Sequence, residues 1–399
     1  MLSYDNIKRI RNAQVKDMMA VFPFICASLC KPFYKEKYKN TWVISDREDE
    51  ASDNGFFFFQ YLTRMHPEQK CVYAIKKSSK DYEKVKDLGT VVEYGSLKHW
   101  IIYLTCSYNI SSQFGHPNGY FCTLLELLGA VETKNVFLQH GITKDHASYL
   151  MSGRRKIDCF ITGAKPEHEY VKKEFGYSEG VVQYTGFARF DSLHDYKTVP
   201  NRILIMPTWR SWLKLKTEQT AELDSNIRES EYLTKWMELL NHPKLDQILR
   251  KYNSEVIFFP HSNFQDYLKD FKPTNPKIII GSKEEYDVQS LMKSSELMIT
   301  DYSSVFFDMA YMKKNVIFYQ FDEEKYRQHH YQQGWFDYHT TSFGKSLKKP
   351  TEVLDELESI LEHGGSISSD FLEEHSRTFE LYDDKNCERI YLYLKNKSQ

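Results

Sequence analysis

Short, β-rich apolar runs alternate with helical stretches along almost the whole of this 399-residue chain. In the first half of the chain such runs lie at residues 41–45, 70–75, 90–94, 108–111, 135–139 and 159–162. Helical stretches at residues 54–65 and 82–88 separate some of them. A strand buried on both faces is a continuous apolar run, and parallel strands need crossover helices between them. The alternation therefore predicts a parallel sheet built from βαβ units.

The pattern restarts after a polar stretch at residues 194–201. A helix is expected over residues 230–252, and further apolar runs lie at residues 202–207, 255–260, 277–280, 297–300 and 316–319. The chain is also longer than one hydrophobic core usually organises. We therefore predict an α/β protein with two Rossmann-like domains facing a central cleft, at residues 41–196 and 197–399, the second with the C-terminal helices. Ligands of such sheets bind beyond the carboxyl ends of the strands.

The first 40 residues form a leader with an apolar segment at residues 18–30. This segment is too short for a membrane span of about 20 residues, and it contains Pro23. It lies between Lys16 and a basic stretch at residues 31–39, which favours contact with an anionic bilayer surface. A helix packed on the N-terminal domain explains it equally well. Because no signal peptide is present, we expect a cytoplasmic protein, peripheral on the inner face of the membrane.

Composition and missing motifs exclude several classes of function. Lys and Arg number 53 against 55 Asp and Glu, so no overall positive charge indicates a nucleic-acid partner. The seven cysteines lack the spacing of zinc or redox sites, which predicts free thiols in a reducing compartment. No Walker loop, GxGxxG or HExxH motif is present. We predict no cofactor and no metal held by the protein, and leave open magnesium bound through substrate phosphates.

One strand exit combines hydroxyl groups with a carboxylate. The apolar run at residues 297–300 ends at Asp301, Ser303 and Ser304, and an amphipathic segment follows. Serines at this position can cap a helix, and the N-terminus of a helix attracts phosphate. A serine-capped helix without a ligand is the alternative for this segment taken alone.

Three further strand exits carry candidate site residues: His140, Arg210 and His261 each follow a predicted strand. A histidine can take a proton from a hydroxyl group near neutral pH, and an arginine can bind a phosphate through two hydrogen bonds. Taken singly, each has a structural explanation, as a histidine that serves its neighbours or as an arginine in an ion pair. Four such strand ends in one chain predict an anionic ligand held between the two domains.

Several motifs of this chain are similar to those of the CDP-glycerol glycerophosphotransferases of teichoic acid synthesis and the related primases and CDP-ribitol polymerases. The resemblance covers most of the chain, and its most specific block is ITDYSSVFFD at residues 299–308. The remaining matching segments are residues 42–47, 53–55 (DNG), 139–144 (QHGITK), 185–191 (TGFARFD), 206–210 (MPTWR), 316–319 and 334–338.

The resemblance implies a GT-B-like fold and a phosphotransferase that takes a polyol phosphate from CDP-glycerol or CDP-ribitol. The acceptor would be a hydroxyl group of a lipid-linked teichoic acid or capsule glycopolymer, with CMP released. It implies that His140 is the acceptor-side base and that His261, also a catalytic candidate, holds the donor phosphates with Ser303 and Ser304. Arg210 and Asp301 complete the predicted donor phosphate site.

Three departures from the family pattern stand out. They are Ala188 in place of a proline, and residues 144–146 and 332–334 in place of the usual sequences. They leave open the polyol, the acceptor polymer, the choice between primase and polymerase, and the oligomeric state. Two alternatives to the transferase also stay open: a GT-B glycosyltransferase or epimerase that uses a UDP-sugar, and a non-catalytic subunit of the same fold.

Overall fold

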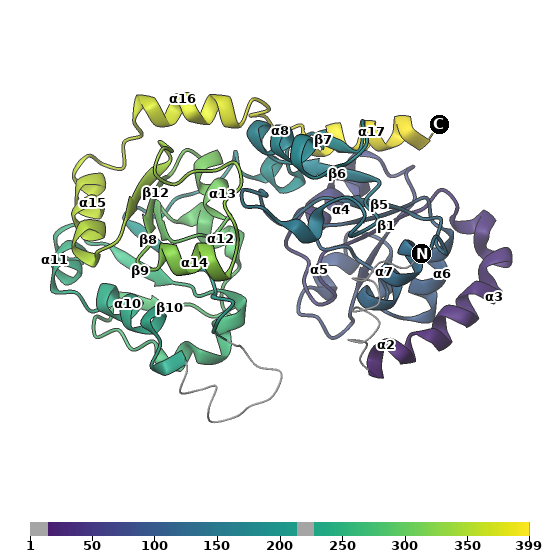
Figure 1. The fold of residues 1–399 in the computed structure, drawn as a ribbon, viewed down its shortest axis with the longest axis horizontal. Helices are drawn as coiled ribbons and strands as arrows, with labels where there is room; N and C mark the ends of the chain where they lie inside the picture. Colours follow the sequence, from purple (N-terminus) through teal and green to yellow (C-terminus); the bar gives the residue numbers. More distant parts are fainter. Residues whose placement is uncertain (1–14, 214–226, 399) are drawn as a thin grey trace. The chain divides into compact units, whose positions relative to one another are not determined.

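The structure is a computed structural model that describes residues 15–213 and 227–398. The start of the predicted leader, residues 1–14, lies outside the described residues. The chain forms two compact units (Figure 1). Unit 1 comprises Met1–His140, Ser148–Asp191 and Asp383–Gln399, and unit 2 comprises Gly141–Ala147 and Ser192–Tyr382. The last helix of the chain, Asn386–Ser398, thus belongs to unit 1.

Unit 1 contains a seven-stranded parallel sheet in the order β3-β2-β1-β4-β5-β6-β7. Its strands are β1 (Trp42–Ser45), β2 (Cys71–Ile75), β3 (Val91–Glu93), β4 (Tyr108–Ser111), β5 (Lys134–Phe137), β6 (Cys159–Thr162) and β7 (Val182–Tyr184). The order is that of a Rossmann sheet extended by one strand. The sequence did not predict β7, because this strand has three residues and only its first is buried.

Helices cover both faces of the unit 1 sheet. They are α2 (Val15–Met19), α3 (Val21–Tyr38), α4 (Asn54–Met65), α5 (Tyr82–Lys86), α6 (Leu97–Thr105), α7 (Gly119–Leu127), α8 (Lys165–Glu174) and α17 (Asn386–Ser398), with short 3-10 helices η1 (Ser148–Leu150) and η2 (Ala188–Ser192). Because neighbouring residues of a strand point to opposite faces, Val43 packs toward Ile102 of α6, while Trp42 stacks on Phe58 of α4. The last helix, α17, is drawn in yellow among the purple and teal elements of unit 1 (Figure 1).

Helix α3 is the described part of the predicted leader, and it packs on α6. On the packed side the Phe24 ring meets Trp100 edge-on at 5.9 Å between centroids. On the other side Phe22, Leu29 and Phe33 are 75%, 71% and 85% exposed. None of the helices in residues 15–213 and 227–398 has the length and apolar character needed to cross a membrane.

Unit 2 contains a six-stranded parallel sheet in the order β10-β9-β8-β11-β12-β13. Its strands are β8 (Arg202–Met206), β9 (Glu255–Phe258), β10 (Ile278–Ile280), β11 (Leu297–Thr300), β12 (Asn315–Tyr319) and β13 (Gly344–Leu347). Relative to the first strand of the unit, this is the 3-2-1-4-5-6 order of a Rossmann sheet. Strand β13 was not predicted, because none of its residues is buried and half of them are polar.

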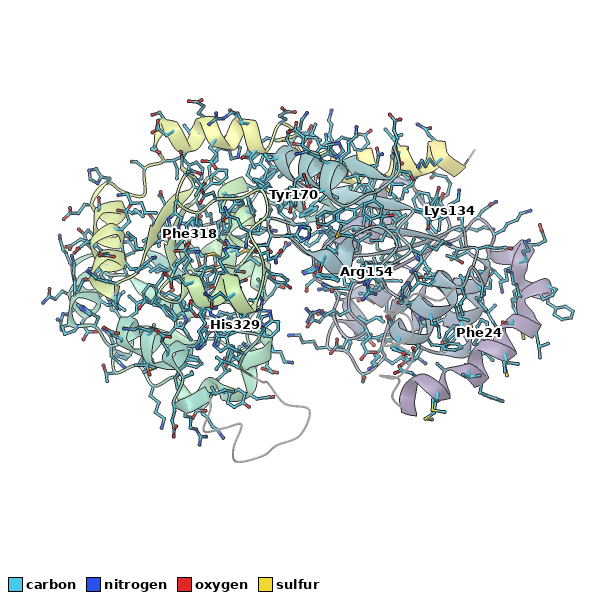
Figure 2. The ribbon with its side chains drawn as sticks, viewed as in Figure 1. Phe24, Lys134, Arg154, Tyr170, Phe318 and His329 are labelled. Atoms are coloured by element: carbon cyan, nitrogen blue, oxygen red, sulfur yellow. The ribbon has the colours of Figure 1, made fainter. Side chains whose placement is uncertain are left out.

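The helices of unit 2 enclose a core that includes Phe318 of β12, labelled in Figure 2. They are α10 (Glu231–Leu240), α11 (Pro243–Lys251), α12 (Val288–Ser294), α13 (Phe306–Tyr311), α14 (Glu323–His329), α15 (Pro350–Glu362), α16 (Ser369–Thr378) and the 3-10 helix η3 (Ser262–Asp270). The single helix predicted over residues 230–252 is wrong, since α10 ends before His242. Pro243 has no N–H to continue a helix, and His242 caps the next one by accepting a hydrogen bond from the Lys244 N–H at 3.2 Å.

Candidate active site

In both sheets the strand order reverses between the first and fourth strands of the unit, where ligands of such folds bind. In unit 1 these strands are β1 and β4, and they are followed by Asp46 and Ser112. The Ser112 hydroxyl donates a hydrogen bond of 2.7 Å to the buried Asp46 carboxylate. The carboxyl end of the unit 1 sheet is thus organised around one buried acid.

Asp46 occupies the N-terminus of α4. Its carboxylate accepts hydrogen bonds from the N–H groups of Asp53, Gly55 and Phe56 at 3.0, 2.8 and 3.1 Å. Burial, and then the nearby charge of Asp53, raises the pKa of Asp46 to about 6. A β-carbon on Gly55 would lie 2.4 Å from the carbonyl oxygen of Ser45, so only glycine fits there. This helix N-terminus is filled by a carboxylate of the protein itself.

Asn54 holds the turn that leads to His140. Its Nδ2 donates to the carbonyl oxygens of Gln139 at 2.7 Å and Leu138 at 3.3 Å, and its Oδ1 accepts from the Arg189 N–H at 3.0 Å. Gln139 has φ of 61°, which is uncommon for a residue other than glycine. A residue other than glycine keeps such a positive φ only where neighbouring groups hold its backbone in place. The hydrogen bonds from Asn54 hold the backbone of Gln139 in this way.

The DNG and TGFARFD motifs meet in this network. Asp53 caps α4, and it also pairs with the Arg189 guanidinium at 3.0 Å. Asp191 accepts hydrogen bonds from the N–H groups of Asn386 and Cys387 at 2.8 and 2.9 Å, at the start of α17. The two motifs therefore fix the turn before His140 and the attachment of α17. Sequence alone supplied the motifs as a resemblance, without these partners.

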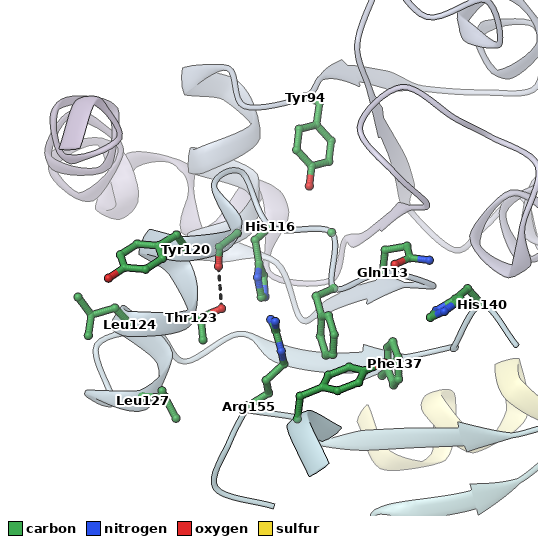
Figure 3. Close-up of a pocket in the computed structure, with 14 residues that line it drawn as sticks. Tyr94, Gln113, His116, Tyr120, Thr123, Leu124, Leu127, Phe137, His140 and Arg155 are labelled. Atoms are coloured by element: carbon green, nitrogen blue, oxygen red, sulfur yellow. Dashed lines mark hydrogen bonds between the residues drawn. The ribbon is translucent and has the colours of Figure 1, made fainter. Parts of the chain in front are cut away.

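His140 follows β5 and lines a cavity of about 470 Å³ in unit 1 (Figure 3). Its side chain is surrounded by protein and still open to solvent, as the wall of a cavity is. Loss of hydration is the largest effect that lowers the pKa of His140, and the positive charges of Arg47 and Arg189 lower it further. A hydrogen bond with the Ser112 backbone acts in the opposite direction, and the resulting pKa is about 4. The imidazole is therefore neutral at pH 7 and has a free electron pair for a proton.

The cavity beside His140 is aromatic and free of carboxylates in its lining. Its aromatic residues are Tyr94, Phe114, Tyr120, Phe137 and Tyr149. Arg155 lies over the Phe114 ring, 4.2 Å from its centroid. In Figure 3, His140 lies at one end of the cavity and Leu127 at the other. A neutral or anionic group with an apolar face matches this lining.

Arg210, predicted to bind phosphate, has no exposed surface. Its Nε and Nη2 donate to the two carboxylate oxygens of Asp322 at 2.7 and 3.0 Å, and its Nη1 lies 2.8 Å from Asp301 Oδ2. Burial alone would lower the pKa of Arg210, but the two carboxylates outweigh it and hold the pKa above its ordinary value. The guanidinium is committed to these acids, which corrects its assignment as a phosphate ligand.

Asp301 is likewise part of this buried cluster and not of an open phosphate site. Its Oδ1 accepts hydrogen bonds from the Thr208 and Tyr302 N–H groups at 2.8 and 2.7 Å. It thereby ties the turn after β8 to the turn after β11, the two strands at the reversal of the unit 2 sheet. A buried carboxylate paired with Arg210 is the opposite of a phosphate donor, so we assign both residues a positioning role.

Ser303 and Ser304 are half-buried and do not cap the next helix. Helix α13 begins at Phe306 with Val305 as its N-cap, so the predicted serine cap is wrong. The Ser303 hydroxyl accepts a hydrogen bond from the Val305 N–H at 3.4 Å. Two serine residues therefore stand in the turn between β11 and α13, at the carboxyl end of the sheet.

His261 follows β9 and is half-buried. Its ring lies 6.4 Å from that of Trp209, between centroids. The Trp209 ring also meets His330 at 4.7 Å, and His330 Nδ1 accepts a hydrogen bond from the Ser211 N–H at 3.2 Å. Burial, followed by the charge of Arg210, lowers the pKa of His330 to about 4. His330 could not be recognised from the strand-exit pattern, because it follows helix α14 and not a strand.

Residues 141–147 pack with unit 2, on the segment around residues 327–335. Asp145 forms an ion pair of 2.6 Å with Arg327, and the His146 N–H donates to the Gln332 carbonyl at 3.0 Å. A β-carbon on Gly334 would lie 2.4 Å from the Lys144 carbonyl oxygen. Two departures from the family pattern, residues 144–146 and 332–334, thus lie against each other.

Metal ligation has no preformed site in the described part of the chain. Among residues 15–213 and 227–398, no group of three or more His, Cys, Asp or Glu side chains is arranged to hold a metal ion.

Comparison with known proteins places this architecture in a family. The family model described as CDP-glycerol:poly(glycerophosphate) glycerophosphotransferase matches residues 25–396. The chain belongs to this family. It is 32% identical over 360 residues to the minor teichoic acid biosynthesis protein GgaB of Bacillus subtilis (strain 168), covering 88% of this chain and 39% of GgaB.

Two further members of the family are similar over much of this chain. The teichoic acid poly(glycerol phosphate) polymerase of Bacillus subtilis (strain 168) is 23% identical over 78% of this chain and 42% of its own length. The teichoic acid glycerol-phosphate transferase of Staphylococcus aureus (strain NCTC 8325 / PS 47) is 22% identical over 78% of this chain and 81% of its length. The chain spans about two fifths of the length of GgaB and of the Bacillus polymerase.

Solved structures show that the fold is GT-B-like. The wall teichoic acid polymerase TagF superposes with a TM-score of 0.62 at 16% identity, over 96% of this chain and 98% of that one. A TagF variant soaked with CDPG gives a TM-score of 0.65 at 15% identity, over 97% of this chain and 100% of that one. The Staphylococcus aureus MnaA–UDP structure gives a TM-score of 0.55 at 12% identity, over 90% of this chain and 96% of that one.

Proposed function

We propose that this chain transfers a polyol phosphate from a CDP-polyol, CDP-glycerol or CDP-ribitol, to a hydroxyl group of a lipid-linked teichoic acid or capsule glycopolymer. The observation that carries the proposal is His140, a neutral imidazole at the wall of a cavity that has no carboxylate in its lining. Membership of the glycerophosphotransferase family supports the reaction class. Two relatives whose names state polymerisation or transfer of glycerol phosphate support it further.

The chemistry needs a base and a set of phosphate ligands. The acceptor hydroxyl loses its proton to His140 as its oxygen bonds to the phosphorus that carries the polyol, and the bond from that phosphorus to the oxygen of CMP breaks. Negative charge gathers on the phosphoryl oxygens and on departing CMP, and hydrogen-bond donors stabilise it. We assign that role to His261, Ser303 and Ser304. Asp301, paired with Arg210, holds the turn from which Ser303 and Ser304 project.

Helix α3 supports attachment to the inner face of the membrane. Phe22, Leu29 and Phe33 project from the side of α3 opposite its contact with α6, and within the described residues of unit 1 they are largely exposed. Apolar side chains on a lysine-containing helix enter the boundary of an anionic bilayer. A lipid-linked acceptor would be held at that surface.

Release of CMP by the His140→Ala variant tests the catalytic assignment. We expect turnover with CDP-glycerol or CDP-ribitol on a lipid-linked acceptor to fall by about 10²- to 10⁴-fold, the usual contribution of a general base. His363→Ala is the matched control, because His363 is exposed at the end of α15 and is expected to be dispensable. Equal turnover of both variants would remove His140 from the mechanism.

Nucleotide preference separates the proposal from its rivals. A ligand that binds the folded state raises the melting temperature, so CDP-glycerol or CDP-ribitol should stabilise the protein and UDP-sugars should not. Stabilisation by UDP-sugars alone would favour a glycosyltransferase or epimerase. No stabilisation by either class, together with no CMP release, would favour a non-catalytic subunit. His261→Ala should raise the KM for the donor or lower kcat, because it removes a proposed phosphate contact.

A further inference from the structure

A second cavity of unit 1, of about 710 Å³, lies at the edge of the sheet opposite His140. Trp42, Tyr108 and Lys134 line it, and they are the first residues of β1, β4 and β5. His140 comes after the other end of β5. Because a strand rises by about 3.3 Å per residue, the four residues of β5 separate the two edges by about 13 Å. The second cavity is therefore no extension of the His140 cavity.

Lysine side chains dominate this second cavity, and they come from four separate segments of unit 1. They are Lys31 and Lys35 of α3, Lys39 directly after it, Lys70 before β2, Lys134 of β5 (labelled in Figure 2), and Lys395 and Lys397 of α17. Glu68 and Glu132 are the two carboxylates of the lining. Seven ammonium groups against two carboxylates leave a local surplus of five positive charges, whereas the whole chain carries a net charge of −2.

The partners of these lysines leave much of that charge uncompensated. Lys31 pairs with Glu132 at 3.4 Å and Lys39 with Glu36 at 2.5 Å, but the two glutamate side chains are 79% and 78% exposed, so both pairs are weak. Lys397 donates to the Gly180 carbonyl oxygen at 3.1 Å, which neutralises no charge. No salt bridge of Lys35 or Lys70 is found within residues 15–213 and 227–398. A concentration of like charges that weak surface pairs compensate only in part points to an anionic ligand.

The lysines of α3 do not lie on its apolar stripe. Phe22, Ile25, Leu29 and Phe33 are spaced by three or four residues and form one exposed stripe. Lys31, Lys35 and Lys39 are spaced by four and form another row. At about 100° per residue, the centres of the two rows lie roughly 120° apart around the helix. When the stripe faces a bilayer, the lysine row is turned well away from it, so contact with a flat membrane does not explain the cavity.

We infer that this cavity binds a flexible polyanion, namely the phosphodiester chain of the acceptor or product polymer. The identity of the polymer rests on the proposed function. A polymer of polyol phosphate carries about one negative charge per repeat, and a flexible chain can enter a concave site that a bilayer surface cannot. Several lysines from different segments can then neutralise successive phosphates, with release of bound counterions as the driving force. The cavity would hold the polymer at a distance from the reacting end.

Inorganic polyphosphate of defined length tests the site directly. The variant Lys35→Glu/Lys70→Glu is compared with Lys172→Glu/Lys173→Glu, which changes the net charge equally on exposed positions of α8. We expect the cavity variant to bind polyphosphate at least about tenfold more weakly and with a shallower salt dependence, because two phosphate contacts are replaced by repulsion. The α8 variant should bind as the unmodified protein does. Equal weakening in both variants would overturn the inference.

Vesicles distinguish the polymer from a lipid headgroup. Binding to vesicles of anionic phospholipid should be nearly unchanged in the cavity variant, because the apolar stripe of α3 is intact. Loss of vesicle binding with polyphosphate binding retained would assign the cavity to lipid headgroups and overturn the inference. Polyphosphate binding needs no catalysis, so a failure of the transferase proposal, seen as no CMP release by the unmodified protein, is measured separately from a failure of this one.

Discussion

Gly141 and Ser304 approach so closely that a β-carbon on Gly141 would lie 2.7 Å from the Ser304 hydroxyl oxygen. Both belong to unit 2, although Gly141 follows His140 directly in the chain. A larger residue at the glycine of the QHGIT segment would therefore displace the Ser304 side chain in the turn after β11. This contact links two of the motifs that the resemblance singled out, and it gives the glycine a steric explanation.

Gly141→Ala should force Ser304 to move and cost about 1–3 kcal/mol of unfolding free energy, as overpacking usually does. In the Ser304→Ala background the hydroxyl is gone, so the cost should be smaller. Chemical denaturation of the four proteins of this cycle measures the coupling. An equal cost in both backgrounds would show that the two residues do not interact.

The lowered pKa of His140 predicts an unusual pH dependence of kcat/KM. If the base had an ordinary histidine pKa of about 6.5, kcat/KM would fall about tenfold between pH 7.5 and 5.5 as the base becomes protonated. With a pKa of about 4, His140 stays neutral over this range, so activity should fall only at lower pH.

Arg47→Gln provides the internal check on that profile. Removing one of the two nearby positive charges makes the protonated imidazole less unfavourable, so the acidic limb should move to higher pH. Arg64→Gln, in the last turn of α4, is the matched control and should leave the acidic limb of the pH profile unchanged. A limb near pH 6.5 in the unmodified protein would contradict the assignment.

Asn54→Asp should lower kcat with little change in the KM for the donor. The substitution replaces the donor Nδ2 by an acceptor, which leaves the carbonyl oxygens of Leu138 and Gln139 without their partner. Unsatisfied buried groups cost about 1–3 kcal/mol each, so the melting temperature should fall too. Asn253→Asp is the control, because the exposed Asn253 accepts a hydrogen bond from Lys277 Nζ at 2.8 Å and aspartate accepts equally well. A raised donor KM with normal kcat would argue against positioning of His140.

Arg210→Met should destabilise unit 2 by about 3–5 kcal/mol, because it strands the buried Asp301 and Asp322 carboxylates. Arg210→Lys keeps the charge but cannot reproduce the two-pronged contact with Asp322, so its melting temperature should also fall. In the folded Lys variant the KM for the donor should be unchanged. Normal stability with a raised donor KM would restore Arg210 as a phosphate ligand.

The sequence was sufficient for most of the sheet architecture. Runs such as residues 297–300 are buried at every position because helices cover both faces, so their strands are almost wholly apolar and could be recognised without a partner. Strands β7 and β13 could not, since they lie at sheet edges and are only partly buried. The break at Pro243 was predictable in principle, because proline cannot lie inside a continuous helix.

The site was harder to predict, because its partners are far apart in the chain. A strand exit that ends in Arg210 signals a positive charge, but Asp322, which holds that charge, lies 112 positions away. The same holds for Asn54, which supports Gln139 from 85 positions away. His140 was expected as a base, whereas the loss of hydration and the two nearby arginines that lower its pKa could be identified only in three dimensions.

The attachment of α17 to unit 1 bears on how the protein is made. Translation delivers residues 141–147 and 192–382, which together form unit 2, before Tyr391 can pack on Trp42 at 5.9 Å between ring centroids. Until then the Asp191 carboxylate lacks the hydrogen bonds that the Asn386 and Cys387 N–H groups later donate to it. On the ribosome, the unit that begins first is therefore finished last, and a nascent chain that stops before residue 383 carries a complete unit 2 beside an incomplete unit 1.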